Sequence, residues 1–181
     1  PFPILAHRAQ MGRAPATLRL GGLWMQETFV YREAGLDDCK EVYARICEME
    51  CRQLPFARFS AIWKAQIDSR QYHCLVCACG NMVAGVLNLR FEPQLHHAAC
   101  IAEIMEFAVA PSYQRQGIGK EMLRRACGIA KDFGCTQIEV ACNQLRADAH
   151  RFYLREGMRN FHFKFSKSLL ENTPKENAIG R

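Results

Sequence analysis

The stretch Gln114-Arg115-Gln116-Gly117-Ile118-Gly119 decides the fold through the residues on either side of it. An apolar run and Ala110-Pro111 precede it, and a periodic amphipathic segment follows, which predicts a strand, a loop and a helix. The first N–H groups of a helix lack intrahelical acceptors and lie at the positive end of its dipole. Glycine lets a ligand approach this backbone closely. The segment therefore predicts a phosphate cradle, with an ordinary pair of loop glycines as the alternative.

Length and composition favour one globular domain with a sizeable core. The chain has 181 residues, of which 49% are apolar and 23% charged. The formal charge is +6, and it falls to +3 without Arg8, Arg13 and Arg19 near the start of the chain. That excess is too small to indicate a nucleic-acid surface, but it is compatible with small anionic ligands. The sequence predicts no membrane-spanning run, and we expect a cytoplasmic protein.

Residues 1–24 resemble neither a signal peptide nor a folded core. They contain scattered proline and glycine and no acidic residue, and Met25 directly precedes the first strand-like segment. We expect a disordered or non-native extension over residues 1–24, a folded domain over 25–170 and a frayed tail over 171–181.

The ten cysteines are interpreted as reduced, mostly buried thiols. Cys74, Cys77 and Cys79 lie in one strand-like run, where 77 and 79 share a face and 74 points to the other. They are therefore badly placed to chelate one metal ion, and without a secretory signal a disulfide framework is not expected.

Apolar periodicity predicts alternating helices and strands in one α/β domain. The stretch 53–59 is expected to be a link between two helices, packed as a hydrophobic staple or facing a substrate. Gly80-Asn81 suits a tight hairpin. The predicted elements are a strand at 28–33, a helix capped by Asp37 or Asp38, a helix from Ser60, strands at 72–79 and 82–91, a strand ending near Ala110, a helix ending at Gly134, a strand at 138–142, a helix capped by Asp148 and closed by Gly157, and a last strand alternating Phe161, Phe163 and Phe165.

This order of elements, the Gln-x-x-Gly-x-Gly run and the later segment 149–158 together resemble the GNAT superfamily of N-acetyltransferases. Within it, His96-His97, the segments 102–106 and 148–157, and 162–165 are similar to the aminoalkylphosphonate N-acetyltransferases, over roughly residues 28–169. The resemblance implies the GNAT fold, a single domain with a central mixed, mostly antiparallel twisted sheet and about four flanking helices. It also implies acetyl-CoA as donor, a small primary amine as acceptor and a homodimer as a family-level expectation.

The resemblance also implies a set of residues that bind acetyl-CoA. The superfamily commonly has asparagine seven residues before its tyrosine, where this chain has Arg146, so Asn143 is the nearest candidate. A backbone N–H near the end of the central strand is expected to polarise the thioester carbonyl, while the loop holds the pyrophosphate. The donor-binding candidates are Phe107, Ala108, Val109, Gln114, Arg115, Gln116, Gly117, Ile118, Gly119, Lys120 and Asn143.

Acetyl transfer to an ammonium substrate requires a base that removes a proton. Strand alternation places Glu103 and Glu106 on opposite rows unless a bulge changes the phase, and each stands among apolar neighbours. We prefer Glu103, from its position in the superfamily, and take Glu106 as second choice. In the alternative interpretation each carboxylate pairs with a basic neighbour.

Tyr153 matches the tyrosine that often protonates the leaving thiolate in the superfamily; the alternative is a tyrosine that only packs its helix. A phosphonate group would need cations or donors opposite the base. The substrate-binding candidates are Arg58, His96, His97, His162 and Lys164, and a divalent metal is left open because adjacent residues of an extended segment point oppositely.

Three functions follow from these residues. The first is a small-amine acetyltransferase, preferably of aminoalkylphosphonates, without nucleic-acid or membrane partners. The second is a protein or peptide N-acetyltransferase, and the third is a non-catalytic acyl-CoA-binding module of the same fold. The pair Glu103 and Tyr153 disfavours the third, and the basic candidates favour an anionic small amine over a peptide.

Overall fold

The computed structural model describes residues 15–20 and 23–169, with side chains from residue 28 onward. The chain divides into two compact units, one ending at Val140 and the other starting at Ala141, and each is described by itself. The strands are β1 (Pro15–Leu20), β2 (Leu23–Glu33), β3 (Tyr72–Cys79), β4 (Met82–Gln94), β5 (Ala99–Val109) and β6 (Cys135–Val140). The helices are η1 (Leu36–Asp38), α1 (Cys39–Glu50), α2 (Phe56–Ile67), η2 (Pro111–Tyr113), α3 (Ile118–Asp132) and, in the second unit, α4 (Ala147–Arg155).

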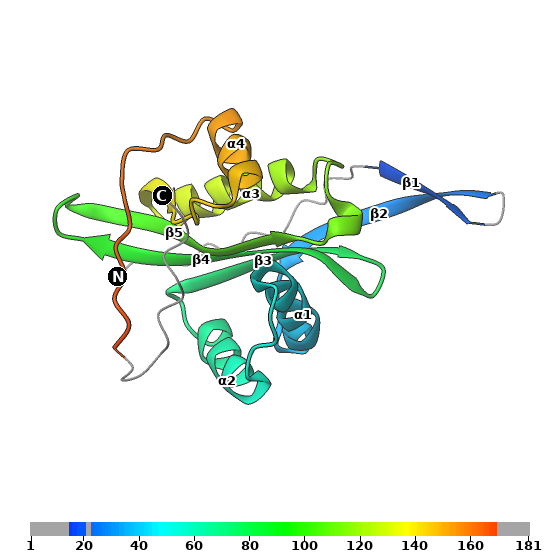
Figure 1. The fold of residues 1–181 in the computed structure, drawn as a ribbon, viewed down its shortest axis with the longest axis horizontal. Helices are drawn as coiled ribbons and strands as arrows, with labels where there is room; N and C mark the ends of the chain where they lie inside the picture. The colour runs from blue at the N-terminus through cyan, green and yellow to red at the C-terminus, as the bar shows by residue number, and fades with distance from the viewer. Residues whose placement is uncertain (1–14, 21–22, 170–181) are drawn as a thin grey trace. The chain divides into compact units, whose positions relative to one another are not determined.

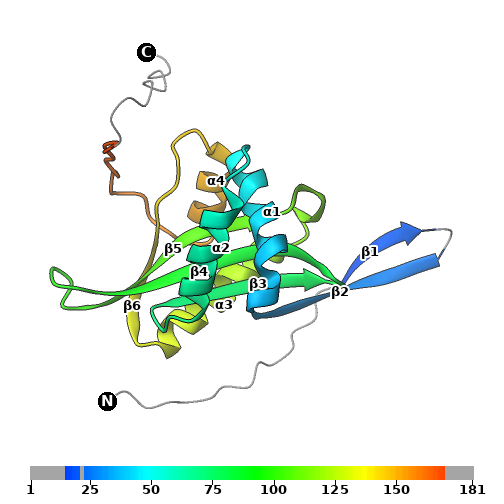
Figure 2. The same cartoon turned by 90° about the horizontal axis from the view of Figure 1, so that it is seen from below.

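The first unit is built on a mixed sheet whose strands lie side by side in chain order, from β1 to β6. Every neighbouring pair is antiparallel except β5 and β6, which are parallel. α3 lies over one face of the sheet and α1 and α2 over the other, as Figures 1 and 2 show from two directions. The predicted α/β class with a mixed, mostly antiparallel sheet is therefore confirmed.

Each face of the sheet packs through the apolar row that its helices present. On the α1/α2 side, Val42, Ile46 and Trp63 pack with Cys74 and Val86 in one buried cluster. On the α3 side, Ile118, Met122 and Ala126 are almost completely buried. Such spacing at three and four residues is that of an amphipathic helix on a core. The central strands are buried over most of their length, which fixes their register.

A bulge interrupts the pairing of β4 with β5. Asn88 pairs with Glu106, but the next residue, Leu89, pairs with Ile104, so Met105 has no partner on β4. An extra residue of this kind reverses the facing of everything beyond it on its own strand. Its consequence for the two glutamates of β5 is described with the site.

Several expected elements differ from the structure. α2 begins at Phe56, so Arg58 and the two phenylalanines lie in its first turn and not in a link. The rings of Phe56 and Phe59 pack edge-on against Tyr43, at centroid distances of 5.0 and 5.2 Å, and the closed packing of a staple is what the structure contains. Asp38 is the N-cap of α1, as one of the two expected candidates, but its side chain makes no capping hydrogen bond, because its carboxylate accepts from Arg32 and from the N–H of Gly35.

The expected last strand is wrong. Residues 158–169 contain no helix or strand, and Phe161, Phe163 and Phe165 are largely exposed. An alternating pattern says which side chains share a face, but a strand forms only where a neighbour accepts its hydrogen bonds. Likewise Arg146, and not Asp148, is the N-cap of α4, and Asp148 pairs with Arg151 inside the helix.

The ends of the chain fall mostly outside the described residues. Residues 1–14 and 171–181, expected as an extension and a tail, lie there. Within the expected extension, residues 15–20 form β1, whose alternation of Ala16, Leu18 and Leu20 with polar residues suits a strand paired with β2. The domain limits themselves stay a prediction.

All ten cysteines are free thiols, and three of them, Cys47, Cys74 and Cys77, are buried. The expectation that most are buried is therefore wrong, since the others are partly or fully exposed. Cys100 and Cys135 face one another across β5 and β6, with their Sγ atoms 3.2 Å apart. None of the helices in the described part of the chain is both long and apolar enough to cross a membrane.

The contact between Gly85 of β4 and Met122 of α3 predicts a stability difference between two glycine substitutions. A Cβ at Gly85 would lie 2.8 Å from Met122 Sδ, whereas a Cβ at Gly128, on the exposed side of α3, would meet nothing within 4 Å. We expect Gly85→Ala to lower the free energy of unfolding by about 1 kcal/mol and Gly128→Ala to raise it by about 0.5–1 kcal/mol. Urea titration followed by circular dichroism measures both.

The same contact is tested by a double-mutant cycle. Met122→Ala alone is expected to cost about 2–5 kcal/mol because it opens a cavity. In that background Gly85→Ala should be nearly neutral, since the clashing sulfur is gone. An equal cost of Gly85→Ala in both backgrounds would exclude Met122 as the cause.

Candidate functional site

The predicted cradle is a tightly bonded turn between β5 and α3. The N–H of Ala110 bonds Ala84 O in β4 at 2.8 Å, and Tyr113 packs edge-on against Phe29 of β2. The side-chain amides of Gln114 and Gln116 donate to backbone oxygens of Val109 and Ser112, at 3.0 and 3.1 Å. Both glutamines therefore fix the loop from within.

Gly117 is the residue that opens this turn toward a ligand. It lies in the left-handed region, with φ of +82°, and a Cβ there would meet no atom within 4 Å. Its carbonyl accepts the first hydrogen bond of α3, from the N–H of Glu121. The three N–H groups between them, those of residues 118–120, are first-turn donors without an intrahelical acceptor. The arrangement suits an anion bound by main chain at the positive end of a fifteen-residue helix.

The side chains of the cradle differ in what they can contact. Ile118 is buried in the core and offers a ligand only its backbone. Arg115 and Lys120 are exposed, and Arg115 is itself in a left-handed conformation, with φ of +62°. Both cations can therefore reach an anion in solvent next to the turn.

β5 offers a backbone donor next to the cradle. The parallel ladder between β5 and β6 ends where Ile104 pairs with Val140. Because Ala110 N bonds to β4 and antiparallel strands alternate their bonding direction, the N–H of Val109 points away from β4. The Val109 N–H therefore points to the edge of β5 that pairs with β6 only as far as Ile104. Phe107, Ala108 and Val109 are all half-buried along this stretch.

The bulge at Met105 brings the two candidate bases to one face of the sheet. Arg90 and Asn88 are two residues apart on β4 and so share a face, and they pair with Glu103 and Glu106 respectively. Plain alternation would have placed the two glutamates on opposite faces. The shared face is the one covered by α1 and α2, since Asn88 also bonds Gln66 of α2.

The two glutamates have different partners. Glu103 accepts a hydrogen bond of 2.6 Å from Arg90, which also contacts Glu92 at 2.9 Å. Glu106 accepts one of 2.9 Å from the neutral amide of Asn88. Burial raises the pKa of Glu106 above its ordinary value, and the charges of Glu50 and Glu103 add to that rise while the Asn88 bond opposes it. A raised pKa makes Glu106 a stronger proton acceptor than an ordinary carboxylate, which suits a general base.

Tyr153 belongs to the second unit, on the half-buried side of α4. Burial raises the pKa of its phenol to about 12, helped by Cys142 and opposed by Arg146. The phenol keeps its proton at neutral pH, as a proton donor must. In the same unit, Asn143 uses its side-chain oxygen to accept from the N–H of Leu145 at 2.9 Å and its carbonyl to accept from the N–H of Arg146. Asn143 thus shapes the turn into α4.

The remaining candidates are spread over the molecule. His96 and His97 lie in the turn between β4 and β5, at the opposite end of β5 from the cradle, and their rings are 4.2 Å apart. The expectation that they point oppositely is wrong, because Ala98 takes a φ of +48° and the segment is a turn, not a strand. His97 Nε2 faces Glu139 at 3.9 Å. His162 and Lys164 are exposed in the second unit, and Arg58 is exposed in the first turn of α2.

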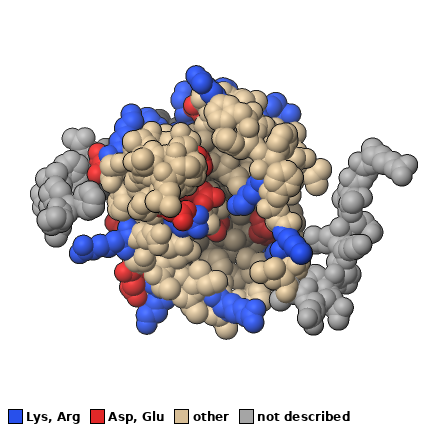
Figure 3. All heavy atoms as spheres, turned by 90° about the vertical axis from the view of Figure 1, so that its left-hand side faces the viewer, with Lys and Arg blue, Asp and Glu red and all other residues tan. Residues whose placement is uncertain are grey.

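Two features bear on charge and metal. Across the described residues, no three His, Cys, Asp or Glu side chains gather as a metal site would require. On the face shown in Figure 3, the basic and acidic side chains are intermixed and form no patch of one sign. Sequence reasoning missed Asn88, which donates to Glu106, and Gln66, which accepts from Asn88. No motif marks these two residues, because their contacts depend on the pairing register.

Comparisons with known proteins agree on one family. The model of the acetyltransferase (GNAT) family matches residues 37–158, across both units. An aminoalkylphosphonate N-acetyltransferase from Salmonella typhimurium is 37% identical over 138 residues, which are 76% of this chain and 90% of that protein.

Solved structures share the fold. A protein described as a transcriptional regulator from Bacillus halodurans has a TM-score of 0.72 at 23% identity, with 78% of this chain and 99% of that chain covered. An aminoglycoside N-acetyltransferase in complex with CoA also has a TM-score of 0.72, at 9% identity, covering 80% and 97%. The predicted resemblance to the family is confirmed.

The different environments of the two glutamates predict opposite effects of the same substitution. The raised pKa of Glu106 means that the folded protein binds a proton there more tightly than the unfolded chain does. Stability is then lost as pH rises from the ordinary carboxyl pKa through the raised one. We expect Glu106→Gln to be more stable than the parent above that range, with the difference vanishing at acidic pH. Glu103→Gln should instead lose the charge of the ion pair with Arg90 and be less stable at neutral pH.

Urea titrations of the parent, Glu106→Gln and Glu103→Gln between about pH 4 and 9 test this prediction. The lower end of this range lies at about the ordinary pKa of a carboxyl group. A Glu106→Gln difference that stays constant across the whole range would show that Glu106 does not titrate in the folded state with a raised pKa.

Proposed function

Since the chain belongs to the GNAT acetyltransferase family and is therefore an acyltransferase, we propose that it moves the acetyl group of acetyl-CoA to the primary amine of an aminoalkylphosphonate. The observation that carries the choice of substrate is the similarity to the Salmonella enzyme, which extends over most of both chains. The cradle, the turned-out N–H of Val109 and the two glutamates of β5 support an acetyl transfer in which the amine attacks directly.

The turn at Gly117 fits the phosphates of such a donor. The space where a Cβ would stand is open, and the first-turn amides of α3 suit a pyrophosphate. Arg115 and Lys120 add positive charge at its solvent side. When bound, the thioester supplies an acetyl group already activated toward amines. The N–H of Val109 is the donor that we propose for the acetyl carbonyl, in the manner of an oxyanion hole.

Glu106 is the base that we propose, in preference to Glu103. Its neighbour is the neutral amide of Asn88, whereas Glu103 bonds a permanently charged guanidinium. A carboxylate held by arginine is a weaker proton acceptor than one held by an amide. Glu106 takes a proton from the substrate ammonium, directly or through one water, and leaves a neutral amine able to attack.

Tyr153 is the proton donor that we propose for the departing thiolate. Its phenol remains protonated across the physiological range, since burial raises its pKa to about 12. Because a phenol is a weaker acid than a thiol, the role that we propose is a hydrogen bond from the Tyr153 hydroxyl to the sulfur as negative charge develops on it.

Recognition of the phosphonate falls to cationic side chains. Arg58 is carried by α2, which covers the same face as Glu106, and it is our first candidate. His162 and Lys164 in the second unit are the others that we retain. His96 and His97 are the least suited, because β5 separates them from the cradle by its full length of eleven residues.

The substrate is tested by release of free CoA thiol from acetyl-CoA with a panel of amines. The panel holds aminomethylphosphonate, aminoethylphosphonate, a polyamine, an aminoglycoside and a lysine peptide, each with and without added divalent metal. We expect turnover on the phosphonates and at least tenfold lower kcat/KM on the polyamine and peptide, because only the phosphonates carry a phosphonate anion one or two carbons from the amine. Turnover confined to peptides would establish the protein-directed alternative.

Tyr153→Phe tests the proton donor. Loss of the hydroxyl should lower kcat by about tenfold or more and leave the KM for acetyl-CoA nearly unchanged. Tyr72→Phe is the matched control, since Tyr72 is a half-buried residue of β3 in the other unit. An undiminished kcat for Tyr153→Phe would remove Tyr153 from the mechanism.

A further inference from the structure

Asn88 is the buried polar side chain at the centre of the α1/α2 face, and only 5% of it is exposed. Its amide nitrogen donates to Glu106 Oε2 at 2.9 Å and to Gln66 Oε1 at 3.0 Å. An amide nitrogen carries two N–H bonds, so both are used. The three residues come from β4, β5 and α2, and they join the sheet to the helix that covers it.

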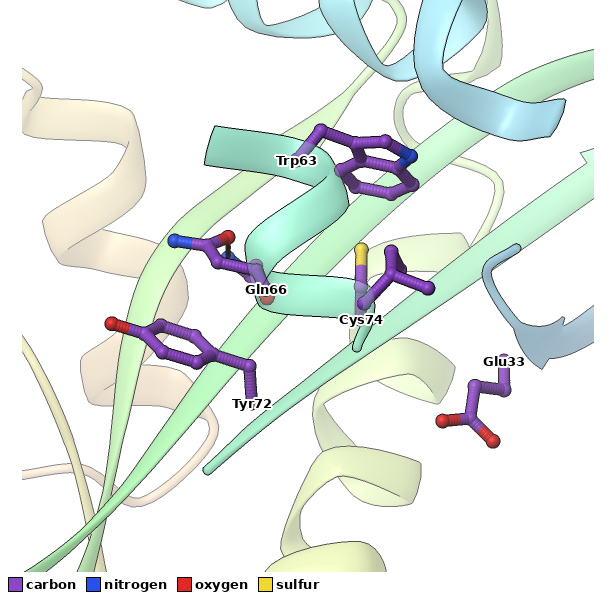
Figure 4. A pocket seen from close by; sticks show the side chains of 7 residues that line it. Glu33, Trp63, Gln66, Tyr72 and Cys74 are labelled. Atoms are coloured by element: carbon purple, nitrogen blue, oxygen red, sulfur yellow. Dashed lines mark hydrogen bonds between the residues drawn. The ribbon is translucent and has the colours of Figure 1, made fainter. Parts of the chain in front are cut away.

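Glu106 and Gln66 together decide which way the Asn88 amide faces. If the amide were turned by half a revolution, its oxygen would face the carboxylate of Glu106 and the oxygen of Gln66. Three acceptors would then meet without a proton between them, at a buried position where such contacts are costly. The carboxylate of Glu106 requires an N–H here, and the oxygen of Gln66 accepts the second N–H, so the two acceptors together hold the Asn88 amide in the orientation that offers an N–H to Glu106. Figure 4 shows the small pocket beneath α2, with Gln66 and Tyr72 among the side chains that line it.

Asn88 affects the pKa of Glu106 in the opposite direction from the acidic groups around it. Glu50 at the end of α1 and Glu103 on β5 are acidic, and both raise the pKa of Glu106. Cys74 on β3 is a buried thiol that stays neutral. Gln66 on α2 is neutral, and Arg90 is engaged with Glu103 and Glu92. Within this set, the Asn88 hydrogen bond is the influence that favours the ionised form of Glu106.

From this geometry we propose that Asn88 is a positioning residue for the base, and that Gln66 acts one step behind it by fixing the Asn88 amide. The inference rests on the proposed role of Glu106. Asn88 cannot titrate and carries no charge, so it holds one carboxylate oxygen in place without neutralising the group that must accept the substrate proton. An arginine at this position would also hold the carboxylate oxygen, but its charge would neutralise the carboxylate that must accept the proton.

The experiment compares kcat/KM against pH for the parent, Asn88→Ala and Gln66→Met, with aminomethylphosphonate as substrate. Without the N–H donor, Glu106 should lose its proton only at higher pH. The acidic limb of the profile should move upward by about one pH unit in Asn88→Ala, which is about a tenfold loss of activity below the limb and near-parent activity above it. Gln66→Met should move the limb in the same direction by less. Tyr72→Phe, at the same pocket, should not move it.

A second readout follows Glu106 without substrate. Carboxyl carbon-13 NMR of protein labelled at glutamate, with Glu106→Gln to assign the resonance, records the titration of Glu106 in each variant. Unchanged titration in folded Asn88→Ala and Gln66→Met would overturn the inference. A loss of activity equal at all pH values would overturn it as well, because it would indicate a structural effect only.

The two readouts also separate the inference from the proposed function. If the Glu106 resonance shifts in Asn88→Ala while the kinetic limb stays in place, Asn88 has no positioning role in catalysis. Glu106→Gln then tells why: a parent-like acidic limb in that variant shows that Glu106 is not the base, and the proposed mechanism fails with it. Loss of the limb in Glu106→Gln retains Glu106 as base and rejects Asn88 alone.

Discussion

The unpaired Met105 in β5 is the constraint on which the arrangement of the site depends. Ahead of it, Glu103 pairs with Arg90; after it, Glu106 pairs with Asn88. One extra residue therefore places two carboxylates, three apart in sequence, on the same face of the sheet. A regular strand would bury one of them among the side chains under α3, where Leu87, Ile118 and Met122 offer no hydrogen bonds.

The bulge also coincides with the end of a ladder. β6 pairs with β5 up to Ile104, one residue before Met105, and the following stretch to Val109 is paired with β4 alone among the strands. A bulge increases local twist and bends its strand, which is a reason for two parallel strands to stop pairing there. The backbone N–H of Val109, which points away from β4, therefore lies beyond the last residue of β5 that pairs with β6.

Sequence patterns predicted the elements that depend on local chemistry. The hairpin at Gly80-Asn81, the amphipathic α3 and its stop before Gly134 all follow from residues near in sequence. Sequence patterns fail to predict the features that depend on pairing between residues distant in sequence. Alternation alone could not place Met105 outside the ladder, and the three phenylalanines 161, 163 and 165 alternate without forming a strand. The sequence favours Glu103 as the base, whereas we propose Glu106. This difference has the same origin, because Arg90 and Asn88 become the partners of the two glutamates only through the pairing register.

The two glutamates divide the charge of this face between them. Arg90 forms an ion pair with Glu103 and so compensates part of the negative charge beside Glu106. Glu106, left with a neutral partner and two acidic neighbours, has the greater tendency to hold a proton. A substrate with an ammonium group would relieve the repulsion between these carboxylates when it binds. After the substrate has given up its proton, it carries no positive charge and no longer relieves that repulsion. In the mechanism that we propose, this face attracts the substrate ammonium and, once the proton is transferred, leaves a neutral amine able to attack the thioester, which is the change in charge that acetyl transfer to an amine requires.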